Sequence, residues 1–408
     1  MKNLYNQLLG IGLSEETKLV PFFTDEPKFH SYLTLPNKPT DEKYFTEETF
    51  GQGFDSNLER AKIKSIGELL ERICLYNPAQ EFISEKYSGQ ENFLRPSSLF
   101  CYSEEQIPDR QKQMKILDNG TYKWIKSKNL TTGKEIYIPA QTVYISPTFE
   151  NEPVLRKEQI STGGAFGSVG EGRAFKSGFL EVIERDGVMA FYLKNLQGRK
   201  IKNFPKRIET LINYLKRYNL ETHIFNASAD LEIPTSFALI LDRTGIGDAI
   251  NVGSKADLNL INAIEGSIME AIQCRRLVRG INPPKCTSNG NVEENIRCLE
   301  DRFAYWSDKE RLKDLEYMIE EKPTMDYLKI QNKTISLENA VSNLKKRGYN
   351  IIITDITLPE LREKGFETLK VTIPELHPLY LDEKAKALFS VHHGEIKDNK
   401  QLKPHPLT

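Results

Sequence analysis

The sequence lacks the short motifs that mark several common enzyme sites. No G-x-x-x-x-G-K-[ST] phosphate-binding loop is present, since Gly133-Lys134 is followed by Glu135. Ser168 has glycine neighbours but not the G-x-S-x-G spacing of a nucleophile elbow, and no H-E-x-x-H zinc motif occurs. These absences argue against a P-loop NTPase, an α/β-hydrolase and a zincin. The pair His392-His393 has no ligand partners at metal spacing and is predicted to lie in a solvated loop.

Cysteine is scarce, and its spacing indicates neither a metal site nor a disulfide framework. The five cysteines are odd in number and form no C-x-x-C pair; they are Cys74, Cys101, Cys274, Cys286 and Cys298. Buried or inert thiols in a reducing compartment fit this pattern, and the cytoplasm is the predicted location.

The chain also lacks a strong net charge and a long apolar run. Its formal charge of −1 gives no electrostatic reason to expect nucleic acid or an anionic membrane as principal partner. No apolar run approaches the length of a bilayer span, and the N-terminus has no signal-peptide cleavage site. With 408 residues, 39% of them hydrophobic, the chain is expected to form one large globular domain or two ordinary ones.

Strand-like and helical segments alternate along the chain, which predicts a mixed α/β or α+β fold without an internal linker. We predict an irregular N-terminal arm at 1–45 with at most one short helix, a domain at 46–383, and a polar tail at 384–408. The charged, mostly helical stretch 285–345 is predicted to form a peripheral layer. Hydrophobic periodicity predicts helices at about 58–76, 207–218 and 256–276, and a helix after the glycine-rich loop that ends at about 194. Strands are predicted at 220–225, 236–242, 349–357 and 369–373, and 134–147 is predicted to be one strand or two strands divided at Pro139.

One pattern occurs three times: an alanine, a small residue four positions later, a glutamate three further on, and a glutamate or glutamine after three more. The copies are Ala61/Ser65/Glu68/Glu71 followed by Arg72, Ala174/Gly178/Glu181/Glu184 followed by Arg185, and Ala263/Ser267/Glu270/Gln273 with Arg275 and Arg276 close behind. Steps of four, three and three keep these positions on one helical face. A solvated charged face would explain one copy, but three with the same spacing indicate a built site.

The residue types of this pattern suit a metal-bound nucleotide. Carboxylates three positions apart can share a hard cation, and Mg²⁺ usually takes a few carboxylates together with substrate phosphates. Backbone N–H groups of the glycine-rich loop at 161–170 and the nearby arginines could hold the phosphate oxygens. From the residues alone, buried ion pairs between packed helices explain the same glutamates and arginines as well.

Several longer segments point to a family. They are Gly51-Gln-Gly53 with SIGELLER at 65–72, STGGAFG at 161–167, EVIERD at 181–186, EAIQCRR at 270–276, TDIT at 354–357, IPELHPLY at 373–380 and the terminal PHPLT. In these segments and in their order the chain resembles the YcaO superfamily, particularly the SagD-type thiazole/oxazole-forming peptide cyclodehydratases (D proteins). The segments span nearly the whole chain.

The resemblance implies an ATP- and Mg²⁺-dependent enzyme with a YcaO-type fold at 46–383, in which three pseudo-repeated Glu-bearing helices surround the site. Its substrate would be a ribosomally made precursor peptide. A Cys, Ser or Thr side chain of the peptide attacks the preceding amide carbonyl, the resulting oxyanion takes the γ-phosphate of ATP, and phosphate then leaves to give an azoline. Because the substrate brings the nucleophile, no catalytic Ser–His or Cys–His pair is needed.

The resemblance also assigns site residues. Mg²⁺–ATP carboxylates are Glu68, Glu71, Glu181 and Glu184, and nucleotide-binding motifs contain Ser65, Arg72, Ser161, Arg185, Glu270, Gln273 and Arg276. In azoline-forming members the C-terminus assists catalysis, and Pro404, His405 and Pro406 match it here. His405 is expected to act as an acid or base there, or else to lie in a frayed tail.

Two positions depart from the family pattern. Gly172-Arg173 replaces an acidic pair before the second helix, in a loop that is one residue longer, so one ATP-contacting carboxylate is either missing or supplied elsewhere. Thr408 replaces the final proline, which puts the catalytic role of the tail in doubt.

Partners and alternatives follow from the same resemblance. The sequence contains no fused leader-peptide-binding or ubiquitin-activating-like domain, so we expect a separate partner protein to bring the precursor peptide; a homodimer is compatible with the family. Thioamide formation with an external sulfide is the alternative within the fold, and the PHP tail argues against it. A non-catalytic ATP-binding accessory protein is the alternative from another class, and Gly172-Arg173 keeps it open.

Overall fold

The computed structural model describes residues 2–37, 49–145, 149–155, 161–281, 292–320, 323–330, 334–399 and 401–407. The chain divides into two compact units. Unit 1 comprises Met1–Phe22, Lys28–Val182 and Leu344–Glu375, and unit 2 comprises Phe23–Pro27, Ile183–Asn343 and Leu376–Thr408. Two helices, α4 (Arg173–Leu193) and α10 (Leu337–Lys346), contribute residues to both units.

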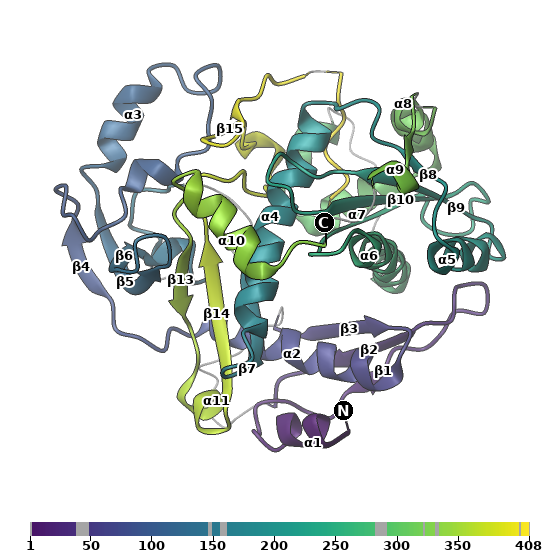
Figure 1. Ribbon diagram of the computed structural model, residues 1–408, viewed down its shortest axis with the longest axis horizontal. Helices are drawn as coiled ribbons and strands as arrows, with labels where there is room; N and C mark the ends of the chain where they lie inside the picture. The colour runs from purple at the N-terminus through teal and green to yellow at the C-terminus, as the bar shows by residue number, and fades with distance from the viewer. Residues whose placement is uncertain are drawn as a thin grey trace. The chain divides into compact units, whose positions relative to one another are not determined.

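Unit 1 contains two antiparallel sheets. One has the order β1-β2-β3, and the other has the order β4-β5-β13-β14-β7 with β6 paired to β5 (Figure 1). The strands are β1 (Lys18–Leu19), β2 (His30–Thr34), β3 (Gly51–Asp55), β4 (Ile83–Lys86), β5 (Thr121–Asn129), β6 (Glu135–Pro139), β7 (Gly164–Ser168), β13 (Ile352–Asp355) and β14 (Phe366–Thr372). The helices wholly in unit 1 are α1 (Lys2–Leu9), α2 (Leu58–Tyr76), α3 (Arg110–Leu117) and α11 (Pro359–Glu363).

Helix α2 lies against β3 at a distance that only glycine permits. A Cβ added at Gly51 would stand 2.0 Å from the carbonyl oxygen of Ser65, and one at Gly53 would stand 1.8 Å from that of Ala61. The apolar face of α2 is buried, with Ile66 and Leu69 fully inaccessible, and Asn57 caps its first turn through a 3.0 Å bond from the Arg60 N–H. The strand is thereby held beside the glutamate-bearing face of the helix.

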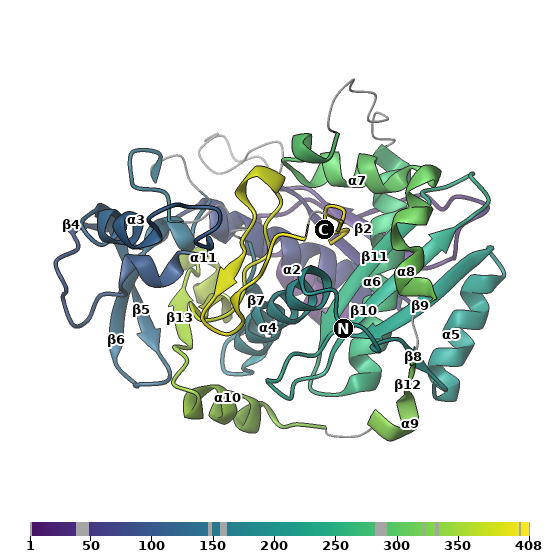
Figure 2. The ribbon, with the colours of Figure 1, turned by 90° about the horizontal axis from the view of Figure 1, so that it is seen from above.

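Unit 2 is organised around a three-stranded antiparallel sheet with the order β11-β10-β9 (Figure 2). The strands of unit 2 are β8 (Ile201–Lys202), β9 (Leu220–Asn226), β10 (Thr235–Asp242), β11 (Ile250–Ala256), β12 (Met325–Asp326), β15 (Phe389–Ser390) and β16 (Gly394–Glu395). Its helices are α5 (Lys206–Lys216), α6 (Leu260–Ile281), α7 (Leu299–Ser307), α8 (Glu316–Ile319) and α9 (Tyr327–Ile330).

The central strand β10 is buried at every position. Helix α6 packs on β10 and β11, and Phe191 from the last turns of α4 meets Phe225 and Phe237 at centroid distances of 5.7 and 5.6 Å. Burial on both faces explains why SFALILD is continuously apolar apart from its ends, a pattern typical of a central strand.

The predicted mixed α/β fold class is confirmed, and so is the helix at 58–76. The strands predicted at 220–225 and 236–242 are β9 and β10. The irregular N-terminal arm is wrong for residues 18–34, because two strands there pair into the β1-β2-β3 sheet. Residues 38–45 of the arm lie outside the described residues. The local sequence hides the pairing because its partner β3 follows more than a dozen residues later.

Two predicted boundaries are corrected. Within 134–147 the strand β6 ends at Pro139, the predicted point of division, and a 3₁₀ turn follows in place of a second strand. The third Glu-bearing helix begins at Leu260 rather than Ala256, because β11 runs through Ala256 and Asn259 accepts a 2.9 Å bond from the N–H of Ile261. Within 285–345 the described residues are mostly helical, as predicted, but they include the short strand β12. No helix among the described residues has both the length and the apolar character that crossing a bilayer requires.

Two glycines of unit 1 give a matched stability test. Gly53→Ala is expected to lower the free energy of unfolding by about 3 kcal/mol, because the new methyl group overlaps the α2 backbone. Gly67→Ala is the control: it lies within α2, where its Cβ would stand 3.6 Å from the Phe166 ring, so helix propensity should stabilise it by about 0.5–1 kcal/mol. Denaturant unfolding measures both. Equal stability of the two variants would contradict the close packing of β3 on α2.

Candidate functional site

Each of the three repeated helices fixes its first glutamate to the backbone of a neighbouring glycine-rich segment. The bonds run from Gln52 N–H to Glu68 Oε2 at 2.7 Å, from Gly163 N–H to Glu181 Oε2 at 3.0 Å, and from Ser254 N–H to Glu270 Oε2 at 2.6 Å. A backbone N–H cannot be removed by a side-chain change, so the position of each carboxylate is set by the strand–helix contact itself.

The small residue one turn earlier makes this contact possible. A Cβ at Gly178 would stand 2.4 Å from the Gly163 carbonyl oxygen, and one at Gly253 would stand 2.3 Å from that of Ser267. The hydroxyl of Ser65 pairs with Thr34 at 2.5 Å and donates to the Gly51 carbonyl at 3.0 Å. The small residues therefore admit the strand backbone. The buried Ser65 hydroxyl thus already has two protein partners. Its predicted contact with a nucleotide stays a prediction.

Unit 1 gathers three of the predicted metal ligands, Glu68, Glu71 and Glu181, which we name the first carboxylate cluster. Glu71 is the buried member: burial and the negative charges of Glu181 and Glu68 raise the pKa of its carboxyl to about 8. Arg72 pairs with Glu68 at 2.8 Å, and its guanidinium lies 5.5 Å from the centre of the Phe50 ring. The neighbouring carboxyls thus favour the protonated form of Glu71, and a bound cation would favour its ionised form instead.

Lys370 is a member of this site that the sequence analysis missed. Its side chain is buried on β14 and donates a 2.5 Å bond to the Thr162 carbonyl oxygen, and its charge lowers the pKa of Glu71 against the effect of burial. The available signal was a lysine inside the apolar strand LKVTI, where an unpaired ammonium would be costly.

Unit 2 gathers Glu184 and Glu270, which we name the second carboxylate cluster. Glu184 accepts bonds from the Ser254 hydroxyl at 2.6 Å and the Ala256 N–H at 3.1 Å, with Lys255 at 3.5 Å. Burial opposes its ionisation, but Lys255, Arg185 and these bonds hold the pKa of Glu184 below its usual value. Burial and the charge of Glu184 raise the pKa of Glu270 to about 7. The pKa values of the two carboxyls therefore differ: Glu184 is ionised, and Glu270 titrates near neutral pH.

The other predicted nucleotide-binding residues lie as follows. Arg185 lies 3.8 Å from Glu184 and is largely buried. Arg276 is also largely buried, and burial lowers the pKa of its guanidinium. Gln273 is half-buried in α6. The carbonyl oxygen of Ser161 accepts a 3.0 Å bond from the Gly164 N–H, which closes the turn before β7. Ser161 therefore lies in unit 1, in the turn before β7. Arg185 lies in unit 2, beside the second carboxylate cluster.

Arg275, adjacent to Arg276, has a structural role. It forms buried ion pairs with Glu26 at 2.9 Å and Asp242 at 2.7 Å, and donates to the Asp248 carbonyl at 2.8 Å. These contacts explain why Phe23–Pro27 belongs to unit 2.

The C-terminal segment is packed into unit 2, which excludes the frayed-tail alternative for His405. The His405 ring is 1% exposed and lies edge-on to Tyr380 at 4.7 Å, and its Nε2–H donates a 2.7 Å bond to the Tyr380 carbonyl. Burial and the nearby charge of Arg302 hold the pKa of His405 well below its usual value. Pro404 and Pro406 are buried as well, and Arg302 donates to the His405 carbonyl oxygen. Thr408 lies outside the described residues.

Gly172 and Arg173, which replace the family's acidic pair, form the start of α4. Gly172 adopts a left-handed φ of 64°, and its carbonyl accepts the 2.9 Å bond from Lys176 that opens the helix. The exposed Arg173 side chain pairs with Glu171 at 2.7 Å. A carboxylate does stand next to the altered pair, at Glu171, although it is held by the arginine.

The prediction that His392-His393 lies in a solvated loop is wrong. Both imidazoles lie against the buried carboxylate of Asp186 on α4, 2.8 and 3.1 Å from its Oδ2. The contact joins residues more than two hundred positions apart, which local sequence patterns do not report.

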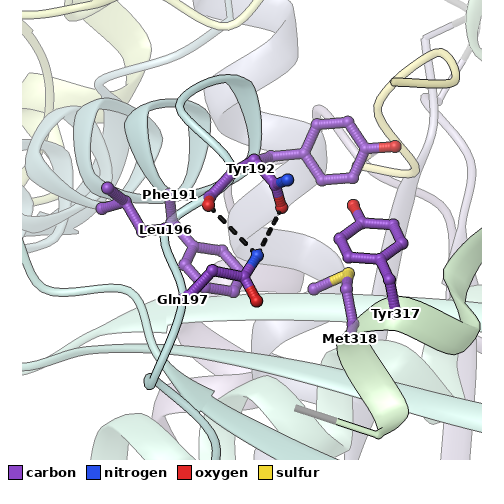
Figure 3. A pocket seen from close by; sticks show the side chains of 7 residues that line it. Phe191, Tyr192, Leu196, Gln197, Tyr317 and Met318 are labelled. Carbon is purple, nitrogen blue, oxygen red and sulfur yellow. Dashed lines mark hydrogen bonds between the residues drawn. The ribbon is translucent and has the colours of Figure 1, made fainter. Parts of the chain in front are cut away.

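Two cavities lined by described residues of unit 2 are too small for a nucleotide. The one at the end of α4, lined by Phe191, Tyr192, Tyr317 and Met318 (Figure 3), has a volume of about 10 Å³. Gln197 borders it and donates to the carbonyl and side-chain oxygens of Asn195 at 3.2 and 2.8 Å. Another, beside Pro406 and Arg302, has a volume of about 10 Å³. Each has room for about one water molecule.

Comparison with known proteins identifies the family. The family model described as "YcaO cyclodehydratase, ATP- and Mg²⁺-binding" matches residues 51–377, most of the chain. The chain therefore belongs to the YcaO family, and the resemblance noted from its motifs is confirmed. No curated protein matches the chain at a significant level.

Solved structures share the fold at low sequence identity. A heterocyclase in complex with substrate and cofactor superposes with a TM-score of 0.71 at 16% identity, over 97% of this chain and 54% of that one. YcaO from Methanopyrus kandleri, bound with AMPPCP and Mg²⁺, gives 0.61 at 15% identity over 92% and 89%. The E. coli microcin synthetase McbBCD complex with pro-MccB17 bound gives 0.65 at 14% identity over 96% and 96%. This chain spans about half the length of that first heterocyclase and, at 47%, of the heterocyclase TruD.

The raised pKa of Glu71 predicts a pH dependence of stability without Mg²⁺. Between its ordinary pKa and about 8 the unfolded chain releases this proton while the folded chain retains it, so stability falls as pH rises through that window. Glu71→Gln removes the effect. The variant should melt at least about 2 °C above wild type at pH 8.5 and at nearly the same temperature at pH 5. Calorimetry in chelator tests this, and a pH-independent difference would contradict a buried, protonated Glu71.

Proposed function

We propose that this protein is an ATP-dependent cyclodehydratase that forms azoline rings on the backbone of a ribosomally made precursor peptide. Membership of the YcaO family supports the reaction class. The observation that favours it most is the pair of carboxylate clusters on glycine-tethered helices, since those groups suit a cation and a triphosphate.

In this proposal Mg²⁺ is bound by Glu68, Glu71, Glu181 and Glu184, and the nucleotide by the residues of the neighbouring motifs. Those residues are Ser65, Arg72, Ser161, Arg185, Glu270, Gln273 and Arg276. The donor set fits: carboxylate oxygens are the ligands Mg²⁺ prefers, and the raised pKa of Glu71 reports an electrostatic demand for a cation. When bound, the ion neutralises phosphate charge and favours transfer of the γ-phosphoryl group.

The protein's own groups then have separate tasks. Glu184 is already ionised through its bonds to Ser254 and Ala256 and needs no proton release, whereas Glu71 must give up a proton to act as a ligand. The Lys370 ammonium limits the negative charge around Glu71 before any cation binds. Arg185 and Arg72 are held in place by glutamates and can donate to phosphate oxygens.

The chemistry requires no nucleophile from the protein. A Cys, Ser or Thr side chain of the peptide adds to the preceding amide carbonyl, and the amide oxygen takes up the γ-phosphoryl group, which releases ADP. Loss of that oxygen as phosphate leaves a C=N bond and the ring, so the peptide loses one water in all. Pro404, His405 and Pro406 are proposed to assist. The match of these residues to the C-terminus of azoline-forming members supports this, and Nδ1 of the neutral His405 ring, which makes no hydrogen bond with any described residue, is the atom that would take up a proton.

We further propose that a separate protein recruits the precursor peptide and that the enzyme works in the cytoplasm; a homodimer is compatible with the family. The likeness to the McbBCD assembly with pro-MccB17 bound supports a partner. Among the described residues, Cys74, Cys101, Cys274 and Cys298 form no disulfide, which is consistent with a reducing compartment.

Reconstitution tests the proposed function. Incubation with ATP, Mg²⁺, the precursor peptide and its recruiting partner should remove one water per ring from the peptide, as read by mass spectrometry. Glu184→Gln should lower the rate by about 100-fold or more, because a buried ligand carboxylate is lost. Glu209→Gln, on the exposed face of α5, is the matched control and should retain the wild-type rate. An unchanged peptide mass with wild-type protein and the full set of components would overturn the proposal.

A further inference from the structure

Side chains of the types that bind metal ions meet at α4, just beyond the second carboxylate cluster. Asp186 follows Glu184 by two positions and therefore points to a different side of the helix. Its side chain is fully buried, and it meets His392 and His393 from the turn after β15. The mechanism proposed above uses none of these three residues.

The three side chains converge on one point. Oδ2 of Asp186 lies 2.8 Å from Nδ1 of His392 and 3.1 Å from Nε2 of His393, and the ligand atoms of all three residues lie within 4.8 Å of one another. The two imidazoles are 2% and 10% exposed, so water reaches them little.

The surroundings hold each group in place from outside. The backbone N–H of His377 donates a 2.7 Å bond to Oδ1 of Asp186, which leaves Oδ2 for the two histidines. Nε2 of His392 lies 2.5 Å from a carboxylate oxygen of Asp230. The Ser390 hydroxyl accepts a 3.0 Å bond from the backbone N–H of His393. A carboxylate on the far nitrogen of a histidine is the usual outer support of a metal-bound imidazole.

Hydrogen bonding alone does not satisfy this arrangement. Nε2 of His393, although buried and 3.1 Å from Oδ2, makes no hydrogen bond with any described residue. An ion with bonds of about 2.0–2.1 Å would need its tetrahedral ligands about 3.3 Å apart, a few tenths of an ångström beyond the observed separations. Two imidazole nitrogens and one carboxylate oxygen are typical of Zn²⁺ and related ions, whereas Mg²⁺ favours oxygen ligands.

We propose that Asp186 Oδ2, His392 Nδ1 and His393 Nε2 bind one first-row divalent transition-metal ion, Zn²⁺ in particular, with water at the fourth position. The ion would fasten the 391–394 turn, and through it the C-terminal segment, to α4. Its role is structural, and it is a different ion from the Mg²⁺ that accompanies ATP.

Metal titration of the full chain, without a histidine tag and stripped by chelator, tests the site. Wild type should retain one Zn²⁺ per chain after desalting in millimolar Mg²⁺, and should bind Co²⁺ with the visible absorption of a tetrahedral nitrogen–oxygen site. His393→Gln should weaken Zn²⁺ at least about 100-fold, and Asp230→Asn, which removes only the outer support, about 10-fold. Glu395→Gln, two residues along, is the control and should bind as wild type.

Stability measurements guard against a variant that simply misfolds. Zn²⁺ should raise the melting temperature of wild type and leave that of folded His393→Gln unchanged, because a ligand stabilises only a state that binds it. Absence of Zn²⁺ uptake by wild type would overturn the proposal in favour of a metal-free Asp–His network. Cobalt–thiolate absorption in the near ultraviolet would overturn it as well, since the metal would then sit on cysteine.

Discussion

The structure of the candidate site depends on one repeated interaction, a backbone N–H of a strand, or of the turn before it, bonded to a helix glutamate. It occurs at Glu68, Glu181 and Glu270, with distances between 2.6 and 3.0 Å. The bond requires the strand backbone to touch the helix, which only glycine and small residues allow. Because each helix carries its glutamates beside other carboxyls, and Glu184 is buried, the fold brings negative charges together where water disperses them less.

The consequence is a division of labour among carboxyls with the same chemistry. Glu184 is surrounded by donors, and its pKa lies below the usual value, whereas the pKa values of Glu71 and Glu270 rise to about 8 and about 7. Environment, not residue type, sets which carboxyl is permanently charged and which responds to a cation. The proposed binding of a metal–nucleotide at these carboxyls would therefore be coupled to release of protons near neutral pH.

Local pattern was enough to predict α2, the continuous apolar strand β10 and the carboxylates of the repeated motif, since helical spacing alone orders those glutamates. Contacts between distant segments were not predictable. Lys370 bonds to Thr162, and His392 to Asp186, across 208 and 206 positions. A histidine pair or a lone strand lysine gives no local sign of its partner, and β2 was missed because only its pairing with β3 makes it a strand.

The most direct test of the account is the coupling between nucleotide binding and proton release. Calorimetric titration with Mg²⁺ and a non-hydrolysable ATP analogue, at pH 7 in buffers of different ionisation enthalpy, counts the protons released. The account predicts release on binding by wild type and a smaller release, with weaker binding, for Glu71→Gln. Tight binding without proton release, unchanged by Glu71→Gln, would contradict it.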